Sequence, residues 1–235
     1  MILVLGGTSA THKVIEGLKD KDTDFIITLA TDYGEREFRL RYPDNVMKIR
    51  FTEETMENFI RNRHVTEIID TTHPHASEIT TTAKNVASKC GIPYTNLVRK
   101  PDEIKETDLV HAFSSYEEAA DFLREAKFGR IFFTTGSNNI HRFSEFAHNG
   151  WVRILPYEKS IEKCVQAGFE RSRIIAMQGP FTTEFNASLF RELGAGCVVS
   201  KNSGEGSGFK EKLNACLILK IHYVVINPPE AEEDH

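Results

Sequence analysis

The sequence has few features of a secreted or membrane protein. Its four cysteines form no Cys-x-x-Cys pair, which argues against a zinc ribbon or a thioredoxin-type redox site and favours reduced, buried thiols. No apolar run approaches the roughly 18–20 residues that cross a bilayer. The apolar segment after Met1 follows no basic region, so we interpret it as a first strand and not as a signal peptide. We expect a cytoplasmic protein that makes no membrane contact.

Positive charge is also not in excess. The 29 lysines and arginines are outnumbered by 34 aspartates and glutamates, for a net charge of −5. A general nucleic-acid binder depends on cations that neutralise phosphates, so no nucleic-acid partner is expected. Residues 230–235 follow two prolines and are mostly acidic, which predicts a frayed acidic tail. Without that tail the chain is nearly neutral, and local basic patches can form.

The composition that remains is that of an ordinary globular protein. Hydrophobic residues make up 40% of the 235 positions and charged residues 27%. These values exclude collagen, low-complexity disorder and a disulfide scaffold. At about 150 residues per domain, the length predicts one or two domains.

Short apolar runs alternate with amphipathic stretches along most of the chain, which predicts an α/β fold with parallel sheets. The expected strands are 2–5, 25–29, 46–49, 67–70, 94–98, 109–112, 130–134, 152–155, 173–177, 196–200 and 223–226. The expected helices are 9–19, 53–63, 76–89, 116–126, 138–146, 161–167, 184–193 and 209–219.

This many strands exceeds what one small sheet accommodates, and a polar segment containing Pro101 interrupts the pattern. We therefore predict two Rossmann-like domains with mainly parallel sheets, residues 1–100 and 101–229, and a ligand cleft between them. Exchange of a strand between the two domains, or return of the last strand to the first sheet, stays open. Parallel α/β sheets bind ligands at the carboxyl ends of their strands, so the turns after the strands are the candidate sites.

Two glycine-bearing turns suit the phosphates of a dinucleotide. Gly6, Gly7, Thr8 and Ser9 join the first strand to its helix, where glycines allow close backbone approach and a helix N-terminus favours an anion. They form a truncated relative of Gly-x-Gly-x-x-Gly, and a capped turn without a ligand is the alternative. The turn with Thr135 and Gly136 repeats this logic in the second half.

The segment 199–212 is rich in glycine, serine and lysine between a strand and a helix. That composition suits the binding of carboxylate or phosphate, although the spacing is not that of a Walker A loop. A flexible surface loop is the alternative. The candidate anion contacts here are Lys201, Asn202, Ser203, Gly204 and Lys212.

Two histidines follow another strand, in Asp70-Thr71-Thr72-His73-Pro74-His75. The His-x-His spacing is that of some metal-dependent hydrolases. Those enzymes need further ligands at other strand ends, and this sequence offers few candidates for them. A helix-capping role and contact with a substrate or cofactor are the other interpretations. Asp70 is close enough in sequence to raise the pKa of His73 if the two side chains meet.

In chain order, the pieces 2–9 (ILVLGGTS), 69–74 (IDTTHP), 134–136 (TTG), 178–181 (QGPF) and 201–204 (KNSG) resemble the precorrin-6A reductases of corrin biosynthesis. The segments 30–34 (ATDYG) and 175–180 (IAMQGP) are more similar to the anaerobic branch, which acts on cobalt-precorrin-6A. The last strand ends in Asn227-Pro228 where the family usually has Arg-Pro.

The resemblance implies an oxidoreductase that transfers a hydride from NADH or NADPH to one double bond of an anionic tetrapyrrole, (cobalt-)precorrin-6A, giving (cobalt-)precorrin-6B in cobalamin biosynthesis. It also implies transient contact with neighbouring enzymes of the corrin pathway and no metal site. Asp32 follows the second strand, where an acid bonds ribose hydroxyls and repels a ribose phosphate, which slightly favours NADH over NADPH. Arg36 and Arg39 are close enough in sequence to reverse that preference. Thr72 joins the cofactor contacts, and His73 is assigned as the proton donor or relay.

Two functions of other classes stay open at this point. One is a metal-dependent hydrolase that uses Asp70, His73 and His75. The other is a non-enzymatic, two-lobed protein that binds an anionic ligand.

Overall fold

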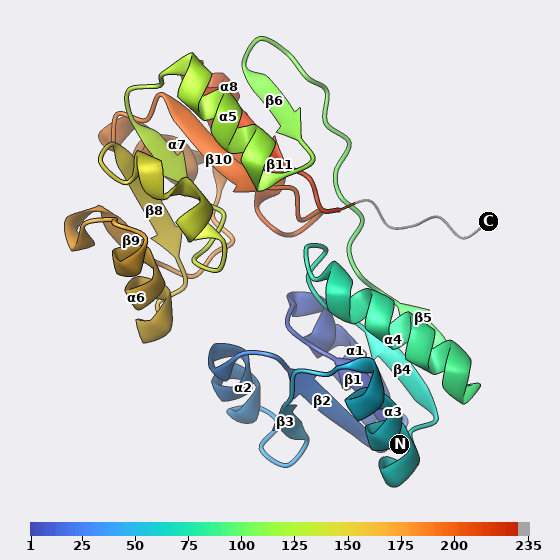
Figure 1. Cartoon of the computed structure of the whole chain (residues 1–235). Helices are drawn as coiled ribbons and strands as arrows, with labels where there is room; N and C mark the ends of the chain where they lie inside the picture. Colours follow the sequence, from blue (N-terminus) through green and yellow to red (C-terminus); the bar gives the residue numbers. More distant parts are fainter. Residues whose placement is uncertain (230–235) are drawn as a thin grey trace. The chain divides into compact units, whose positions relative to one another are not determined.

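The computed structural model describes residues 1–229, and the expected acidic tail, 230–235, lies outside the described residues. The chain divides into two compact units, the first spanning Met1–Arg99 and the second beginning at Lys100. Figure 1 shows that each unit has a sheet of its own with helices on both faces. The predicted α/β class with mainly parallel sheets is confirmed, since every ladder between named strands is parallel.

The first unit has a five-stranded sheet with the order β3-β2-β1-β4-β5. Its strands are β1 (Ile2–Leu5), β2 (Phe25–Leu29), β3 (Val46–Lys48), β4 (Glu67–Asp70) and β5 (Tyr94–Asn96). Its helices are α1 (Ser9–Lys19), α2 (Asp32–Arg39), α3 (Glu53–Arg63) and α4 (Ser77–Cys90). Side chains of α3 and α4 pack on one face of the sheet and those of α1 and α2 on the other. Because both faces are covered, the central strands are nearly continuous apolar runs.

The second unit has a six-stranded sheet with the order β6-β11-β10-β7-β8-β9. Its strands are β6 (Val110–Phe113), β7 (Ile131–Phe133), β8 (Gly150–Ile154), β9 (Ile174–Ala176), β10 (Cys197–Lys201) and β11 (His222–Ile226). Its helices are α5 (Tyr116–Ala126), α6 (Glu158–Gln166), α7 (Thr183–Glu192) and α8 (Phe209–Leu219), with the short 3-10 helices η1 (Ile140–Phe146) and η2 (Arg171–Arg173). One core lies under α5, η1 and α6, and the other lies under α7 and α8.

The strand order of each sheet reverses direction at one point. In the first unit the chain builds outward from β1 to β2 and β3, then crosses to β4 on the other side of β1. In the second unit it builds from β7 to β8 and β9, then crosses to β10 on the other side of β7. Such switch points open a crevice at the carboxyl ends of the two central strands, and this is where open α/β sheets bind ligands.

Hydroxyl caps explain why the helices begin where they do. The side chains of Thr8, Thr31, Thr52, Ser115 and Thr182 each accept a backbone N–H in the first turn of α1, α2, α3, α5 and α7. Each cap satisfies a donor that the helix itself leaves unpaired. The expected helices 9–19, 53–63 and 116–126 begin at the same residues as α1, α3 and α5.

The structure corrects three local predictions. Helix α2 was not predicted, because Phe38 is its only buried residue and its sequence is almost entirely polar. The expected helix 138–146 is the 3-10 helix η1, interrupted at Phe143. Helix α6 begins at Glu158, three residues before the expected start.

Two broader expectations can also be compared with the fold. Among residues 1–229 each sheet uses only strands of its own unit, so no strand is exchanged there. In the same described part of the chain, no helix combines the length and apolar character needed to cross a membrane.

Candidate functional site

The turn between β1 and α1 leaves room above its backbone. A Cβ added to Gly6 would lie 2.9 Å from Ile27 Cγ2, so a side chain here would force its neighbours to shift. Gly7 is exposed, has a φ of +141°, and has no atom within 4 Å of an added Cβ. The first glycine packs against the sheet, and the second presents bare backbone to solvent, which is the arrangement that close approach of a phosphate requires.

A chain of threonines joins this turn to the one after β4. Thr8 Oγ1 donates to the Thr71 carbonyl at 2.8 Å, and the hydroxyls of Thr11 and Thr71 lie 2.8 Å apart. Thr71 Oγ1 donates in turn to the Leu5 carbonyl at 2.8 Å. Thr11 and Thr71 are fully buried. The two turns at the first switch point are therefore held as one rigid unit.

Asp70 is a structural carboxylate. Its Oδ1 accepts from the backbone N–H and the hydroxyl of Thr72 at 2.9 and 2.7 Å, and its Oδ2 accepts from Thr80 Oγ1 and Tyr94 OH at 2.7 and 2.9 Å. The side chain is fully buried, and four donors satisfy its two oxygens. This arrangement orients Thr72, a predicted cofactor contact, and desolvation with the nearby carboxylate raises the pKa of Tyr94.

His73 lies half-buried at the carboxyl end of β4. Its Nδ1 accepts the backbone N–H of His75 at 3.2 Å, so in the neutral ring the proton sits on Nε2. The rings of His73 and His75 are 5.5 Å apart between centroids. With Nδ1 held as an acceptor, the neutral ring offers Nε2–H as a hydrogen-bond donor.

Asp32 begins α2 directly after β2 and forms an ion pair with Lys48 at the end of β3. The acid thus stands where a Rossmann sheet contacts the ribose, with a cation beside it. Arg39, which is close enough in sequence to Asp32 to favour a ribose phosphate, pairs with Glu35 at 2.8 Å.

Arg99 was missed as a site residue, because its segment was interpreted only as a domain boundary. Its guanidinium donates to Ser9 Oγ, a predicted cofactor contact at the start of α1. The sequence signal was its place three residues after the end of β5, on the same edge of the first sheet.

The second switch point carries an unsatisfied hydroxyl. Thr134 Oγ1 donates to the Val199 carbonyl at 2.9 Å and so ties the end of β7 to β10. Its neighbour Thr135 is 2% exposed, and within residues 1–229 its Oγ1 has no hydrogen-bond partner. Gly136 follows with a φ of +78° and open space around it. A buried hydroxyl without a partner is costly, so this position fits a site that a ligand completes.

Asn202 holds the loop after β10 in place. Its amide nitrogen donates to the Asp102 carbonyl at 2.8 Å and to Asn227 Oδ1 at 3.0 Å, while its oxygen accepts the Asp102 N–H at 2.9 Å. These bonds assign Asn202 a positioning role. Ser203 is 7% exposed, and Gly204 adopts a φ of +70°.

Lys201 and Lys212 lie in the same unit and are shielded from water. Lys201 ends β10 and is half-buried, and Lys212 lies in α8 with 8% of its surface exposed. Burial lowers the pKa of Lys201 to about 8. Burial and the charges of Arg153 and Lys201 lower the pKa of Lys212 to about 7. Arg153, on β8, was not predicted as a site residue. The apolar pattern that predicts a strand does not show which charged side chains lie near it in the folded chain.

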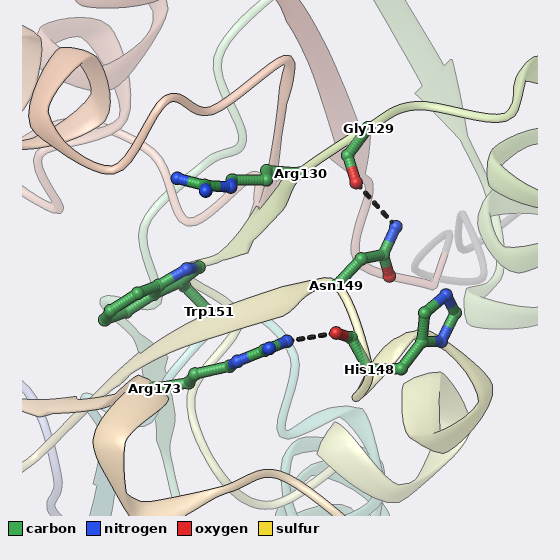
Figure 2. Close-up of a pocket in the computed structure, with 6 residues that line it drawn as sticks. All are labelled: Gly129, Arg130, His148, Asn149, Trp151 and Arg173. Carbon is green, nitrogen blue, oxygen red and sulfur yellow. Dashed lines mark hydrogen bonds between the residues drawn. The ribbon is translucent and has the colours of Figure 1, made fainter.

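One cavity lies away from these turns. It has a volume of about 290 Å³ and is lined by Gly129, Arg130, His148, Asn149, Trp151 and Arg173 (Figure 2). These residues stand at the amino ends of β7, β8 and β9, opposite the switch-point edge. Figure 2 shows Arg173 donating to the His148 carbonyl and Asn149 to that of Gly129. Because these polar groups stabilise backbone carbonyls, we assign the cavity a structural role.

A metal centre receives no support from the described geometry. In the part of the chain that the structure describes, no three His, Cys, Asp or Glu side chains gather as metal ligands would. The carboxylate of Asp70, one member of the proposed hydrolase cluster, is already satisfied by threonine and tyrosine donors.

Two parallel sheets with glycine- and hydroxyl-bearing turns at their switch points define a Rossmann-like α/β protein of the class that binds ligands at the carboxyl edges of its sheets. Comparison with known proteins gives the family. The chain belongs to the family described as Precorrin-6x reductase CbiJ/CobK, whose model matches residues 1–235. It is therefore an oxidoreductase of a family that reduces precorrin-6A in cobalamin biosynthesis and generally uses a nicotinamide cofactor.

Individual relatives agree with this assignment. The cobalt-precorrin-6A reductase of Priestia megaterium is 34% identical over 99% of this chain and 92% of its own length. That of Salmonella typhimurium is 27% identical over 97% and 87%. The structure of CobK precorrin-6A reductase matches with a TM-score of 0.79 over 99% of this chain and 89% of that one, at 23% identity, and shows the same fold. The family resemblance in the sequence is confirmed, and it favours a reductase over the hydrolase and the binding protein.

Proposed function

We propose that this chain reduces cobalt-precorrin-6A to cobalt-precorrin-6B with a nicotinamide cofactor. Relatives that match 97–99% of this chain carry the name of that substrate. The observation that carries the proposal is the pair of turns at the first switch point, where exposed Gly7 lies beside the rigid Thr8–Thr71 connection. Such turns suit the phosphates of a dinucleotide, and hydride transfer requires no protein residue that attacks the substrate.

The residues present fit such a cofactor. Gly6, Gly7, Thr8 and Ser9 offer backbone and hydroxyl donors for its phosphates, and Asp32 stands where a ribose is bound. Thr72, oriented by Asp70, is the further contact in the first unit. In the second unit, Thr135 and Gly136 remain proposed cofactor contacts, because the buried Thr135 hydroxyl has no hydrogen-bond partner among residues 1–229. Bound, the reduced nicotinamide supplies the hydride.

The direct test is turnover of cobalt-precorrin-6A with each reduced nucleotide. We expect one nucleotide to be oxidised per macrocycle reduced, with NADH preferred, because Asp32 repels a ribose phosphate. Asp32→Asn should lower the ratio of kcat/KM for NADH to kcat/KM for NADPH. Asp44→Asn, an exposed change in the same unit, is the matched control. Failure of the wild-type protein to turn over with either nucleotide contradicts the proposed function.

His73 is proposed to contact substrate or cofactor through Nε2–H. His73→Asn keeps a hydrogen-bonding group but shifts it, so we expect the KM of one ligand to rise several-fold while the pH profile of kcat keeps its shape. Loss of kcat with intact binding, together with loss of a pH limb near the ordinary histidine pKa, would instead make His73 the proton donor. His75→Asn is the control and should leave the KM values unchanged. The bond from His75 to the His73 Nδ1 comes from the His75 backbone N–H, which the substitution keeps.

A further inference from the structure

Arg99, the last residue of the first unit, reaches the turn where we place the cofactor phosphates. The chain leading to it is fixed, because the Leu97 N–H donates to the Asp70 carbonyl at 2.8 Å and continues the pairing of β5 with β4. The Arg99 guanidinium then donates through Nη2 to Ser9 Oγ, at the first residue of α1. Since β4 separates β5 from β1, about 10 Å at ordinary strand spacing, the arginine extends across the carboxyl end of β4.

The Arg99 guanidinium has no counter-ion in the part of the chain that the structure describes. None of the ion pairs among residues 1–229 includes it, and its bond to Ser9 is its one hydrogen bond there. The first turn of α1 carries no acidic residue. Arg99 is partly buried, and a guanidinium has five N–H donors. Most donors of this partly desolvated cation therefore lack an acceptor, and an oxyanion would complete them.

Ser9 adds two further donors at the same place. Its Oγ accepts from Arg99, so its own hydroxyl proton is directed away from the guanidinium. Its backbone N–H has no acceptor among residues 1–229, as is usual in the first turn of a helix. By contrast, the N–H groups of Gly7 and Thr8 both donate to Thr11 Oγ1, at 3.2 and 3.3 Å. Ser9 and Arg99 thus place free donors where Gly7 leaves the backbone bare.

The strand order separates these donors from the predicted ribose site. Asp32 follows β2, which lies on the other side of β1 from β4 and β5, whereas Arg99 comes after β5. A dinucleotide that crosses the carboxyl end of β1 with its adenosine ribose at Asp32 has its diphosphate over the β1–α1 turn. The diphosphate, and not the ribose, is therefore the part of the cofactor within reach of Arg99.

We propose that Arg99 and Ser9 bind the diphosphate of the nicotinamide cofactor, with the guanidinium as its counter-ion. The inference rests on the proposed function for the identity of the cofactor. Gly7 lets the diphosphate approach the turn, and Arg99 supplies the positive charge that the residues of the turn lack. A carboxylate of the macrocycle has the same oxyanion chemistry, so the two ligands are measured separately.

The test compares binding of NADH, NADPH and ADP-ribose, which keeps the diphosphate but lacks nicotinamide, in calorimetric titrations. Arg99→Met should weaken binding of all three about tenfold, as expected for loss of a hydrogen bond to a charged group. The ratio of the Kd values for NADH and NADPH should stay unchanged, because the ribose phosphate lies on the Asp32 side. Arg63→Met removes an exposed arginine from the end of α3 in the same unit, and should bind all three as the wild type does.

Two further measurements separate a charge contact from a structural role. The wild-type Kd for ADP-ribose should rise with salt more steeply than that of Arg99→Met, because salt screens a partly exposed charge pair. Arg99→Lys keeps the charge but loses the planar fork, so it should recover part of the affinity. The free energy of unfolding of each variant is determined in parallel.

The outcomes separate this inference from the proposed function. If Arg99→Met binds ADP-ribose as tightly as Arg63→Met does, the diphosphate contact is wrong, whatever the change in the free energy of unfolding. Weakened cobalt-precorrin-6A binding with unchanged ADP-ribose binding also overturns it, since the oxyanion would then be a substrate carboxylate. Arg99-dependent cofactor binding without turnover contradicts the proposed function and leaves the diphosphate contact supported. Absence of binding of all three nucleotides by the wild type overturns both.

Discussion

Gly7→Val is expected to weaken binding of the nicotinamide cofactor by at least tenfold, which corresponds to about 1.4 kcal/mol of binding free energy. Gly7 has a φ of +141°, a conformation that a β-branched residue adopts only at a cost of about 1–3 kcal/mol. The turn must therefore either shift or place a valine side chain in the open space over its backbone, where we place a cofactor phosphate. The measurement is the Kd for NADH, with the free energy of unfolding determined in parallel.

Gly17→Val is the matched control for that experiment. Gly17 is an exposed residue of α1, the helix that follows the Gly7 turn, with no atom within 4 Å of an added Cβ and no positive φ. The same side chain is thus added ten residues away without strain, and the Kd for NADH should stay at its wild-type value. If Gly7→Val binds NADH as tightly as Gly17→Val does, the cofactor does not lie on this turn.

Lys212→Met is expected to raise the free energy of unfolding at pH 6–7 by about 1–4 kcal/mol while it weakens substrate binding. Replacement of a buried charge by an apolar side chain of similar volume commonly stabilises a protein by that amount. Burial lowers the pKa of Lys212 from 10.5 to about 7, so the charged form is disfavoured in the folded state. A residue that destabilises the fold and improves binding is typical of functional sites.

The pH dependence gives the sign of this effect. Below about pH 7 Lys212 is charged in both the folded and the unfolded chain, so the full burial cost opposes folding. Between about pH 7 and 10.5 the folded protein binds fewer protons than the unfolded chain, so the wild type gains stability as pH rises. The advantage of Lys212→Met should therefore shrink steadily over that range. Urea denaturation at pH 6, 8 and 10 measures it, and an advantage independent of pH would contradict the assigned burial of a charge.

Much of the secondary structure could be predicted because local features decide it. Apolar runs such as Ile2–Leu5 are buried on both faces, and each of the eleven expected strand segments overlaps an observed strand. Hydroxyl caps such as Thr52 and Ser115 fix where a helix begins, because each accepts the backbone N–H of a residue only three positions later. Helix α2 escaped prediction for the converse reason, since Phe38 alone marks its buried side.

The candidate site could be predicted less completely. The sequence indicated Gly6, Gly7 and the lysines of 199–212, because their residue types carry their chemistry with them. It also suggested that Asp70 acts on His73, whereas the structure engages the Asp70 oxygens with Thr72, Thr80 and Tyr94. Partners such as Thr80 and Tyr94 lie 10 and 24 residues away in sequence, and only packing brings them to one carboxylate.

The sequence by itself determined the α/β class, the family and the turns that bear glycine and hydroxyl groups, because periodicity, capping and short motifs are local properties. The tertiary structure alone decided the strand orders, and with them the two switch points that bring the turns after β1 and β4, and after β7 and β10, side by side. It also decided that Arg153 and Lys201 act on a buried Lys212. Burial and electrostatic potential depend on neighbours in space, and those neighbours come from elements far apart along the chain.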